Sequence, residues 1–192
     1  MTGRKIGILA LQGDFAKHDA MLKSLHVDTL LVKKAKELDG CDGLVIPGGE
    51  STTLTKLMRL YGMYEPIREF SLTRPIMGTC AGMIMLASQV DDERITPLQL
   101  IDISVKRNAY GRQIDSFISE VKLPFLANDS SFRAIFIRAP QITAVGSDVE
   151  ILLELDKKPV MVRNRNIFAL AFHPELTDDS RIHRYFLENF SA

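Results

Sequence analysis

Residues 74–87 have the sequence RPIMGTCAGMIMLA, and the rest of the chain can be placed around them. The short apolar run after Pro75 predicts a buried strand, and the dense apolar positions after Cys80 predict a helix packed on a sheet. Cys80 would then lie at the turn between the two, flanked by Gly78 and Gly82 in the pattern G-x-C-x-G. This is the cysteine counterpart of the serine nucleophile elbow, a tight turn that needs glycines where helix and sheet approach closely.

Two interpretations of Cys80 follow from this pattern. In the first, the thiol is a nucleophile that projects from the sheet at the start of a helix, where unpaired N–H groups and the helix dipole favour the thiolate. In the second, Cys80 is a buried structural cysteine in a glycine-rich turn, because free cysteines are commonly buried. A general base elsewhere in the chain is needed to decide between them.

The composition indicates an ordinary globular protein. The chain has 192 residues, which is enough for one well-packed domain over 1–192 and too few for two. Lys plus Arg equals Asp plus Glu at 24 each, so the net charge does not suggest a nucleic-acid or membrane partner. Cys41 and Cys80 provide no disulfide framework, and the apolar run 6–11 is too short for a signal-peptide core or a membrane span. We therefore expect a cytoplasmic protein.

The first half of the chain alternates between predicted strands and helices. Buried strands are expected at 5–11, 27–32, 43–46 and 75–78. Helical spacing of apolar residues is found between them, at 15–25, 34–38, 54–61 and 67–70. Asp14 is a candidate N-cap for the first of these helices. This alternation predicts an α/β fold with a doubly wound, mostly parallel sheet flanked by helices.

After Val90 the pattern changes to short β runs. They lie at 101–105, 117–121, 132–137, 149–155, 159–162 and 167–172. Because few helical stretches separate these runs, we expect antiparallel strands added to the sheet. A last amphipathic helix is expected at 179–190, with a buried stripe formed by Ile182, Phe186, Leu187 and Phe190.

Several polar or glycine-rich segments follow predicted strands and should meet at one edge of the sheet, because active sites of open α/β sheets lie at the carboxyl ends of strands. These segments are Gln12-Gly13, Gly48-Gly49-Glu50 and Cys80. The N–H groups of the Gly48-Gly49 pair are not shielded by side chains, which suits an oxyanion hole completed by the N–H of Ala81. A purely structural turn is the competing interpretation of the two glycines.

A histidine–acid pair ends the last predicted strand. His173 and Glu175 are two residues apart, so in extended backbone they face the same way, and Pro174 fixes φ between them. Glu175 could orient the imidazole while His173 takes the thiol proton, which completes a nucleophile–base–orienter triad with Cys80.

The other histidines, His18, His26 and His183, lack such a partner in the sequence and are expected to be ordinary helix-face residues. No group of Cys and His residues has zinc-binding spacing, so neither a metal nor another cofactor is expected.

Cys80, His173 and Glu175, in this order on an α/β sheet, resemble the triad of class I glutamine amidotransferases. Six stretches resemble, more narrowly, the glutaminase subunits of pyridoxal 5′-phosphate synthases: 11–13, 47–52, 78–82, 107–113, 137–140 and 172–176. The stretches R-N-x-x-G-R-Q at 107–113 and I-R-A-P at 137–140 are the specific ones, because related glutaminases share the others. The matching positions extend over nearly the whole chain.

The resemblance implies hydrolysis of L-glutamine to L-glutamate and ammonia through a glutamyl thioester on Cys80. It also implies a set of residues that hold the substrate, namely Gly48, Gly49, Glu50, Arg107, Ile137 and Arg138. Gly49 and Ala81 would form the oxyanion hole. Ammonia would pass to a separate (β/α)₈ barrel synthase subunit that builds pyridoxal 5′-phosphate, and Gln12 would couple docking of that partner to catalysis.

Three other interpretations stay open at this point. The chain could be another glutaminase subunit, such as the one that serves imidazole glycerol phosphate synthase. It could be a non-catalytic binding or regulatory module, because a fold does not fix a function, although such a relative would be expected to lack a triad member. It could also be a cysteine peptidase or a chaperone-like relative, which would act on peptides and ignore glutamine.

Overall fold

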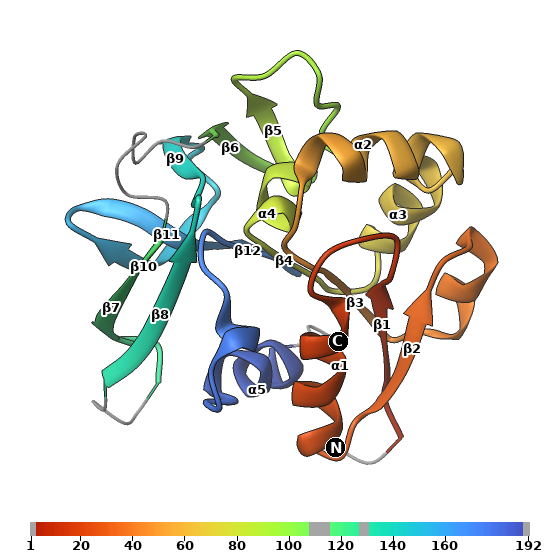
Figure 1. Ribbon diagram of the computed structural model, residues 1–192, viewed down its shortest axis with the longest axis horizontal. Helices are drawn as coiled ribbons and strands as arrows, with labels where there is room; N and C mark the ends of the chain where they lie inside the picture. Colours follow the sequence, from red (N-terminus) through yellow and green to blue (C-terminus); the bar gives the residue numbers. More distant parts are fainter. Residues whose placement is uncertain (1–2, 108–115, 127–130, 190–192) are drawn as a thin grey trace.

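The central sheet has seven strands in the order β10-β11-β12-β4-β3-β1-β2 (Figure 1). The computed structural model describes residues 3–107, 116–126 and 131–189. A parallel core is formed by β1 Lys5–Leu9, β2 Asp28–Val32, β3 Gly43–Ile46, β4 Ile76–Thr79 and β12 Ile167–Leu170. Two antiparallel strands extend it beyond β12, namely β11 Lys158–Asn164 and β10 Glu150–Leu155.

The middle of the sheet is buried on both faces. Every residue of β3, β4 and β12 is buried, which explains why these strands are continuous apolar runs and do not alternate between apolar and polar residues. Helices cover the two faces, with α1 and α5 on one side and α2, α3 and α4 on the other (Figure 1). The predicted α/β fold with a doubly wound, mostly parallel sheet is therefore confirmed.

The helices lie close to their predicted positions. Their bounds are α1 Phe15–Ser24, α2 Ser51–Leu60, α3 Tyr64–Ser71, α4 Ala81–Leu86 and α5 Arg181–Glu188, and the 3₁₀ turns are η1 Ala35–Gly40 and η2 Pro174–Leu176. The helix after Cys80 is short because a strand begins at Ala87. On α5, Ile182, Phe186 and Leu187 are buried as expected, whereas Phe190 lies outside the described residues.

The β runs of the second half do not all join the central sheet. Only β10, β11 and β12 do so, and β12 pairs with β4 in parallel, whereas the sequence predicted antiparallel strands. A second sheet is formed by β5 Ala87–Val90, β6 Ile101–Lys106 and β9 Gln141–Val145, and a separate antiparallel pair by β7 Ser116–Lys122 and β8 Ser131–Ile137. The pairing of β5 with β6 is parallel, and the sequence pattern predicted neither β5 nor β9. The buried and exposed positions of β6 alternate, so this strand buries a single face and needs a sheet of its own.

Within the described part of the chain, none of the helices combines the length and the apolar character that crossing a membrane requires. The expectation of a single domain over 1–192 stays a prediction.

Close backbone contacts place the start of α4 against the sheet. A Cβ atom on Gly82 would overlap the carbonyl oxygen of Ile46 in β3, and a Cβ atom on Gly78 would lie 2.6 Å from the carbonyl carbon of Gly82. Glycine is therefore required at both positions on steric grounds, because backbone atoms cannot move aside as the end of a flexible side chain can. The spacing between α4 and the sheet depends on these two residues.

Replacing Gly82 by Ala should lower the free energy of unfolding by about 3 kcal/mol, because the added methyl group overlaps a backbone carbonyl in the core. Urea unfolding followed by circular dichroism measures the change. Gly40→Ala is the matched control, since a Cβ atom there meets no atom within 4 Å. Equal stability of the two variants would contradict the steric argument.

Candidate active site

Cys80 lies at the predicted turn between β4 and α4. Its backbone has φ 49° and ψ −104°, a conformation that residues other than glycine rarely adopt. The N–H of Cys80 donates to the carbonyl of Leu170 in β12 at 2.8 Å, and its carbonyl accepts from Ile84 in α4 at 3.2 Å. The strained turn is therefore held by hydrogen bonds on both sides, as a nucleophile elbow requires.

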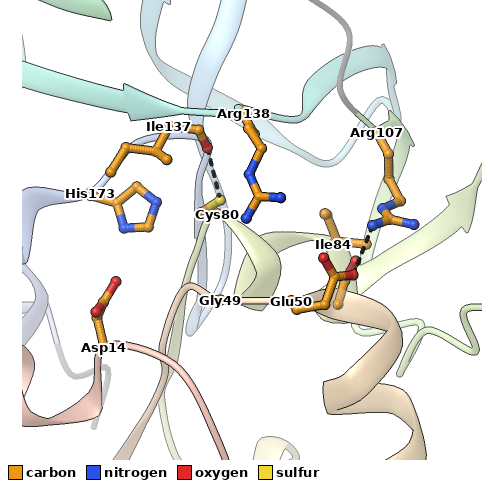
Figure 2. Close-up of a pocket in the computed structure, with 10 residues that line it drawn as sticks. Asp14, Gly49, Glu50, Cys80, Ile84, Arg107, Ile137, Arg138 and His173 are labelled. Carbon is orange, nitrogen blue, oxygen red and sulfur yellow. Dashed lines mark hydrogen bonds and ion pairs between the residues drawn. The ribbon is translucent and has the colours of Figure 1, made fainter. Parts of the chain in front are cut away.

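The structure brings His173 and Glu175 together beside this elbow. His173 Nδ1 lies 2.6 Å from Glu175 Oε1, and both side chains are almost fully buried. The backbone N–H of His173 donates to the carbonyl of Ile135 in β8 at 2.8 Å, which fixes the segment after β12. Cys80 Sγ lies 3.8 Å from the carbonyl oxygen of Ile137 in the same strand. Strand β8 therefore lies across the site and contacts both the backbone of His173 and the thiol of Cys80 (Figure 2).

The electrostatics of the site favour a protonated His173. Burial by itself lowers the pKa of this imidazole, but hydrogen bonds and charge interactions with Cys80 and Glu175 outweigh burial and raise the pKa from its ordinary value of 6.5 to about 10. An imidazolium beside Cys80 stabilises the thiolate, which is the reactive form of cysteine. The arrangement can therefore perform nucleophilic catalysis.

The Gly48-Gly49 loop packs against the triad and against Gln12. A Cβ atom on Gly48 would overlap Cε1 of His173, so only glycine allows the loop to lie this close to the imidazole. The Gly48 carbonyl accepts from the N–H of Asp14 at 3.2 Å. Gly49 has φ +150°, and a Cβ atom there would lie 2.6 Å from the Gln12 amide.

Gln12 holds the residue that follows the loop. Its Oε1 accepts from the N–H of Glu50 at 3.1 Å, whereas its buried Nε2 has no hydrogen-bond partner among the described residues.

A cavity of about 130 Å³ opens over Cys80 (Figure 2). Its lining residues are Asp14, Gly49, Glu50, Ser51, Cys80, Ile84, Arg107, Ile137, Arg138 and His173. The lining thus includes all the predicted substrate-binding residues except Gly48, which contacts His173 instead. The rest of the stretch 107–113, from residue 108 onward, lies outside the described residues. Two arginines and two acids around a small cavity suit a small ligand that carries both charges.

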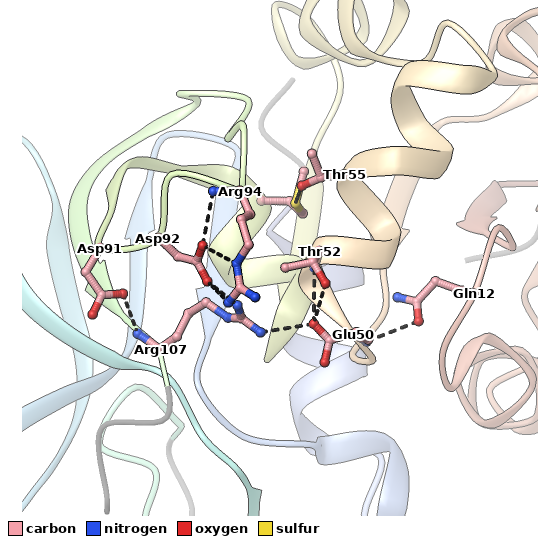
Figure 3. Close-up of polar contacts among 9 residues, drawn as sticks. Gln12, Glu50, Thr52, Thr55, Asp91, Asp92, Arg94 and Arg107 are labelled. Atoms are coloured by element: carbon pink, nitrogen blue, oxygen red, sulfur yellow. Dashed lines mark hydrogen bonds and ion pairs between the residues drawn. The ribbon is translucent and has the colours of Figure 1, made fainter.

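Glu50 and Arg107 lie on the opposite side of the cavity from His173 (Figure 2). They belong to a network of charged side chains (Figure 3). Arg107 Nη2 lies 3.0 Å from Glu50 Oε1, and the same guanidinium pairs with Asp92. Thr52 donates to Glu50 Oε1 from its backbone N–H and from its hydroxyl. Burial raises the pKa of Glu50, but these Thr52 hydrogen bonds and the positive charges of Arg107 and Arg138 bring it below the usual value. Glu50 is therefore a carboxylate at neutral pH.

Arg138 differs from Arg107 in its contacts. Its backbone is left-handed, with φ 43°, and its side chain points into the cavity (Figure 2). No ion pair joins Arg138 to another residue in the parts of the chain that the structure describes.

Several residues of the site were not predicted. Asp14 is at the N-cap position of α1, but its side chain makes no capping hydrogen bond. Its carboxylate lies within 4.8 Å of the ligand atoms of His173 and Glu175, a grouping that local sequence patterns do not reveal. Asp14, His173 and Glu175 carry groups of the kind that bind metal ions. The 2.6 Å hydrogen bond between His173 and Glu175 explains without a metal why these two side chains lie close together.

The expectation for His18 and His183 is wrong. Both are fully buried, and His18 has polar contacts on both sides of its ring. Its Nδ1 lies 2.9 Å from His183 Nε2, and its Nε2 lies 3.2 Å from the Thr79 hydroxyl and 3.4 Å from Glu175 Oε2. No sequence signal could have found this contact, because the two histidines are 165 residues apart. His26 is exposed, as expected.

A cysteine at a strained strand–helix turn, a buried His–Glu pair and a glycine loop at the end of a neighbouring strand define the class I glutamine amidotransferase type of site. Comparison with known families agrees with this class. A model of the SNO glutamine amidotransferase family matches residues 8–192. The chain belongs to this family.

Curated relatives and a solved structure extend the comparison. The chain is 48% identical to the pyridoxal 5′-phosphate synthase subunit PdxT of Desulforudis audaxviator over 96% of this chain and 97% of the relative. It is 49% identical to the PdxT subunit of Thermotoga maritima, over 96% and 98% of the two chains. A crystal structure described as a glutamine amidotransferase superposes with a TM-score of 0.91 at 42% identity, covering 97% of this chain and 99% of the other.

The pKa of His173 should influence stability. Because folding raises this pKa from 6.5 to about 10, the stabilisation is fully present below pH 6.5 and is lost as the pH rises toward 10. In Glu175→Gln the carboxylate that stabilises the imidazolium is absent, so the free energy of unfolding should decrease less over this range than in the parent protein. Urea unfolding across about pH 6 to 10 measures both dependences. Parallel curves for the two proteins would contradict the assigned role of Glu175.

Proposed function

We propose that this chain hydrolyses L-glutamine to L-glutamate and ammonia with Cys80, His173 and Glu175, and that the ammonia serves a pyridoxal 5′-phosphate synthase. The observation that carries the proposal is the strained Cys80 turn beside a His173–Glu175 pair joined at 2.6 Å. Membership of a glutamine amidotransferase family supports the substrate, and the names of the curated relatives support the pathway.

In the proposed mechanism the Cys80 thiolate attacks the carboxamide carbon of glutamine. The N–H groups of Gly49 and Ala81 stabilise the resulting oxyanion, and the His173 imidazolium donates its proton to the departing ammonia. Neutral His173 then takes a proton from water as the water attacks the glutamyl thioester. Collapse of the second tetrahedral intermediate releases glutamate and restores the thiolate beside the imidazolium. Glu175 holds the imidazole throughout.

The charges around the cavity suit an α-amino acid. Arg138 projects into the cavity without an ion pair to any described residue, so we assign the substrate carboxylate to Arg138. Arg107 instead neutralises Glu50 and Asp92. The hydrogen bonds that Glu50 receives from described residues all end on Oε1, which leaves Oε2 to accept from the substrate ammonium.

The partner that we infer is the (β/α)₈ barrel subunit of the synthase. The curated relatives are described as subunits, and a subunit needs a partner. Gln12 contacts both Gly49 and Glu50, so a partner that moves Gln12 would also move the loop that supplies the oxyanion hole. Both cysteines are free, which supports the cytoplasmic location that we also propose. We further propose a single domain over 1–192, which the match of one family model to residues 8–192 supports.

Glutamate release from L-glutamine, with and without the barrel subunit, tests the proposal. We expect strong stimulation by the barrel subunit and a loss of at least about 10⁴-fold in Cys80→Ala, because the nucleophile is absent. Cys41→Ala is the matched control, since Cys41 is a buried cysteine that does not line the cavity.

Three outcomes would overturn parts of the proposal. Turnover of casein without turnover of glutamine would indicate a peptidase. Stimulation only by the barrel of imidazole glycerol phosphate synthase would indicate a different pathway. No glutamate release with a bound, compatible partner would indicate a non-catalytic relative.

Gln12→Ala should reduce the stimulation by the barrel subunit by about 10-fold or more, because the Gly49 loop loses the amide that positions it. Rates of glutamate release over a range of partner concentrations separate weaker docking from weaker catalysis. The control is Gln89→Ala, which changes an exposed glutamine on β5. If Gln12→Ala is stimulated as strongly as the parent protein, the coupling role of Gln12 is wrong.

A further inference from the structure

A buried pair of histidines lies behind the triad. His18 comes from α1 and His183 from α5, two helices that lie on the same face of the sheet (Figure 1). The imidazole rings are 5.1 Å apart between centroids, and Nδ1 of His18 lies 2.9 Å from Nε2 of His183. On its other side, His18 Nε2 lies 3.2 Å from the Thr79 hydroxyl and 3.4 Å from Glu175 Oε2. The mechanism above uses neither histidine.

The contacts of the pair determine where its protons lie. Burial lowers the pKa of His183 to about 4, and burial together with the charges of His183 and His173 lowers the pKa of His18, so both imidazoles are neutral at neutral pH. A neutral imidazole has one donor and one acceptor nitrogen. If Nδ1 of His18 carried the proton, the lone pair on Nε2 would face the Glu175 carboxylate and repel it.

His183 therefore donates from Nε2 to His18 Nδ1, and Nε2 of His18 carries the N–H that hydrogen-bonds the Thr79 hydroxyl at 3.2 Å. The same nitrogen lies 3.4 Å from Glu175 Oε2, a buried oxygen that has no hydrogen-bond partner among the described residues. Nδ1 of His183 then carries only a lone pair, in agreement with its having no hydrogen-bond partner among the described residues. This assignment leaves no buried N–H of the pair without a partner.

We propose that His18 is a positioning residue of the triad and that His183 fixes the tautomer in which His18 holds Glu175. The proposal rests on the function proposed above for Cys80, His173 and Glu175. The two oxygens of Glu175 face different partners, since Oε1 lies against His173 and Oε2 against His18. The positive end of the His18 N–H dipole attracts Oε2, and this attraction opposes rotation of the carboxylate away from the imidazole that it orients.

The charges around Glu175 explain why a second partner is needed. His173 is the cation of the site, and the Asp14 carboxylate, from the start of α1, lies within 4.8 Å of the Glu175 oxygens and repels them. Thr79 in β4 and the neutral His18 and His183 complete the polar groups around it. The N–H of His18 opposes the repulsion from Asp14, so the Glu175 carboxylate stays directed toward His173.

The test compares His18→Leu, which removes the donor, with His18→Gln, whose amide N–H can reach the same carboxylate. Leu22→Ala is the matched control, because Leu22 is a buried apolar residue of the same helix. All variants carry Cys41→Ala, so that Cys80 is the only free thiol. One readout, the pH dependence of Cys80 alkylation by iodoacetamide, needs neither substrate nor partner.

We expect the same pH dependence of Cys80 alkylation in the parent protein, in His18→Gln and in Leu22→Ala. In His18→Leu the alkylation profile should shift by roughly one unit to higher pH, because a loosened Glu175 stabilises the imidazolium less. The kcat for glutamine, measured with the barrel subunit, should fall by about 10- to 100-fold. KM should change little, since His18 does not line the cavity.

The possible failures are distinguishable. If His173→Ala leaves the alkylation profile unchanged, the proposed triad is wrong. If His173→Ala shifts the profile and His18→Leu does not, or if Leu22→Ala shifts it equally, the positioning role of His18 is wrong while the proposed function stands. Should His18→Leu not fold, His183→Leu replaces it, because it removes only the donor that fixes the tautomer. A profile of His183→Leu identical to that of the parent would overturn the proposal.

Discussion

The close contact between the Gly82 backbone and the end of β3 is the constraint on which the rest of this structure depends. Because Gly78 and Gly82 have no side chains, α4 can begin directly above the sheet, and the chain turns from strand to helix within one residue, Cys80. Cys80 has a positive φ, a backbone conformation that costs free energy. The hydrogen bonds around Cys80 and the burial of α4 offset this cost. A looser turn would place the thiol away from the imidazole.

The polar residues of the site form two groups, one around His173 and Glu175 and the other around Arg107 and Glu50. On one side, Cys80, His173 and Glu175 form a chain of acid, base and nucleophile, nearly all of it removed from water. On the other side, Arg107 forms ion pairs with Glu50 and Asp92, and Arg94 forms a second ion pair with Asp92. Most of these charges are paired within the protein, whereas Arg138, which lines the cavity between the two regions, has no ion pair to a described residue.

Local sequence patterns were sufficient for the central sheet, the elbow and the His173–Glu175 pair. The buried parallel strands are continuous apolar runs, and the two triad residues are neighbours in sequence, so both could be predicted without tertiary information. Gly78 and Gly82 indicated the turn because a close approach requires glycine at fixed positions. Predictions from the sequence were weaker after Val90, where strands that each bury one face could belong to any sheet, and β9 was missed.

The contacts that could not be predicted all join distant elements. The sequence indicates only that His18 and His183 lie on helices, and their contact depends on the packing of α1 against α5. Likewise the sequence indicates only a helix cap for Asp14, and the proximity of its carboxylate to Glu175 depends on the tertiary fold.

Helix α1 contacts two parts of the site at once. Its first turn binds the Gly48 carbonyl through the Asp14 N–H, and one turn later His18 faces Glu175. The helix is rigid over this distance, so a small rotation or translation of α1 would displace the oxyanion loop and the orienting acid in the same movement. The positions of the oxyanion loop and of the acid that orients His173 are therefore coupled through α1. A ligand that binds to the outer face of α1 and moves the helix would change both positions.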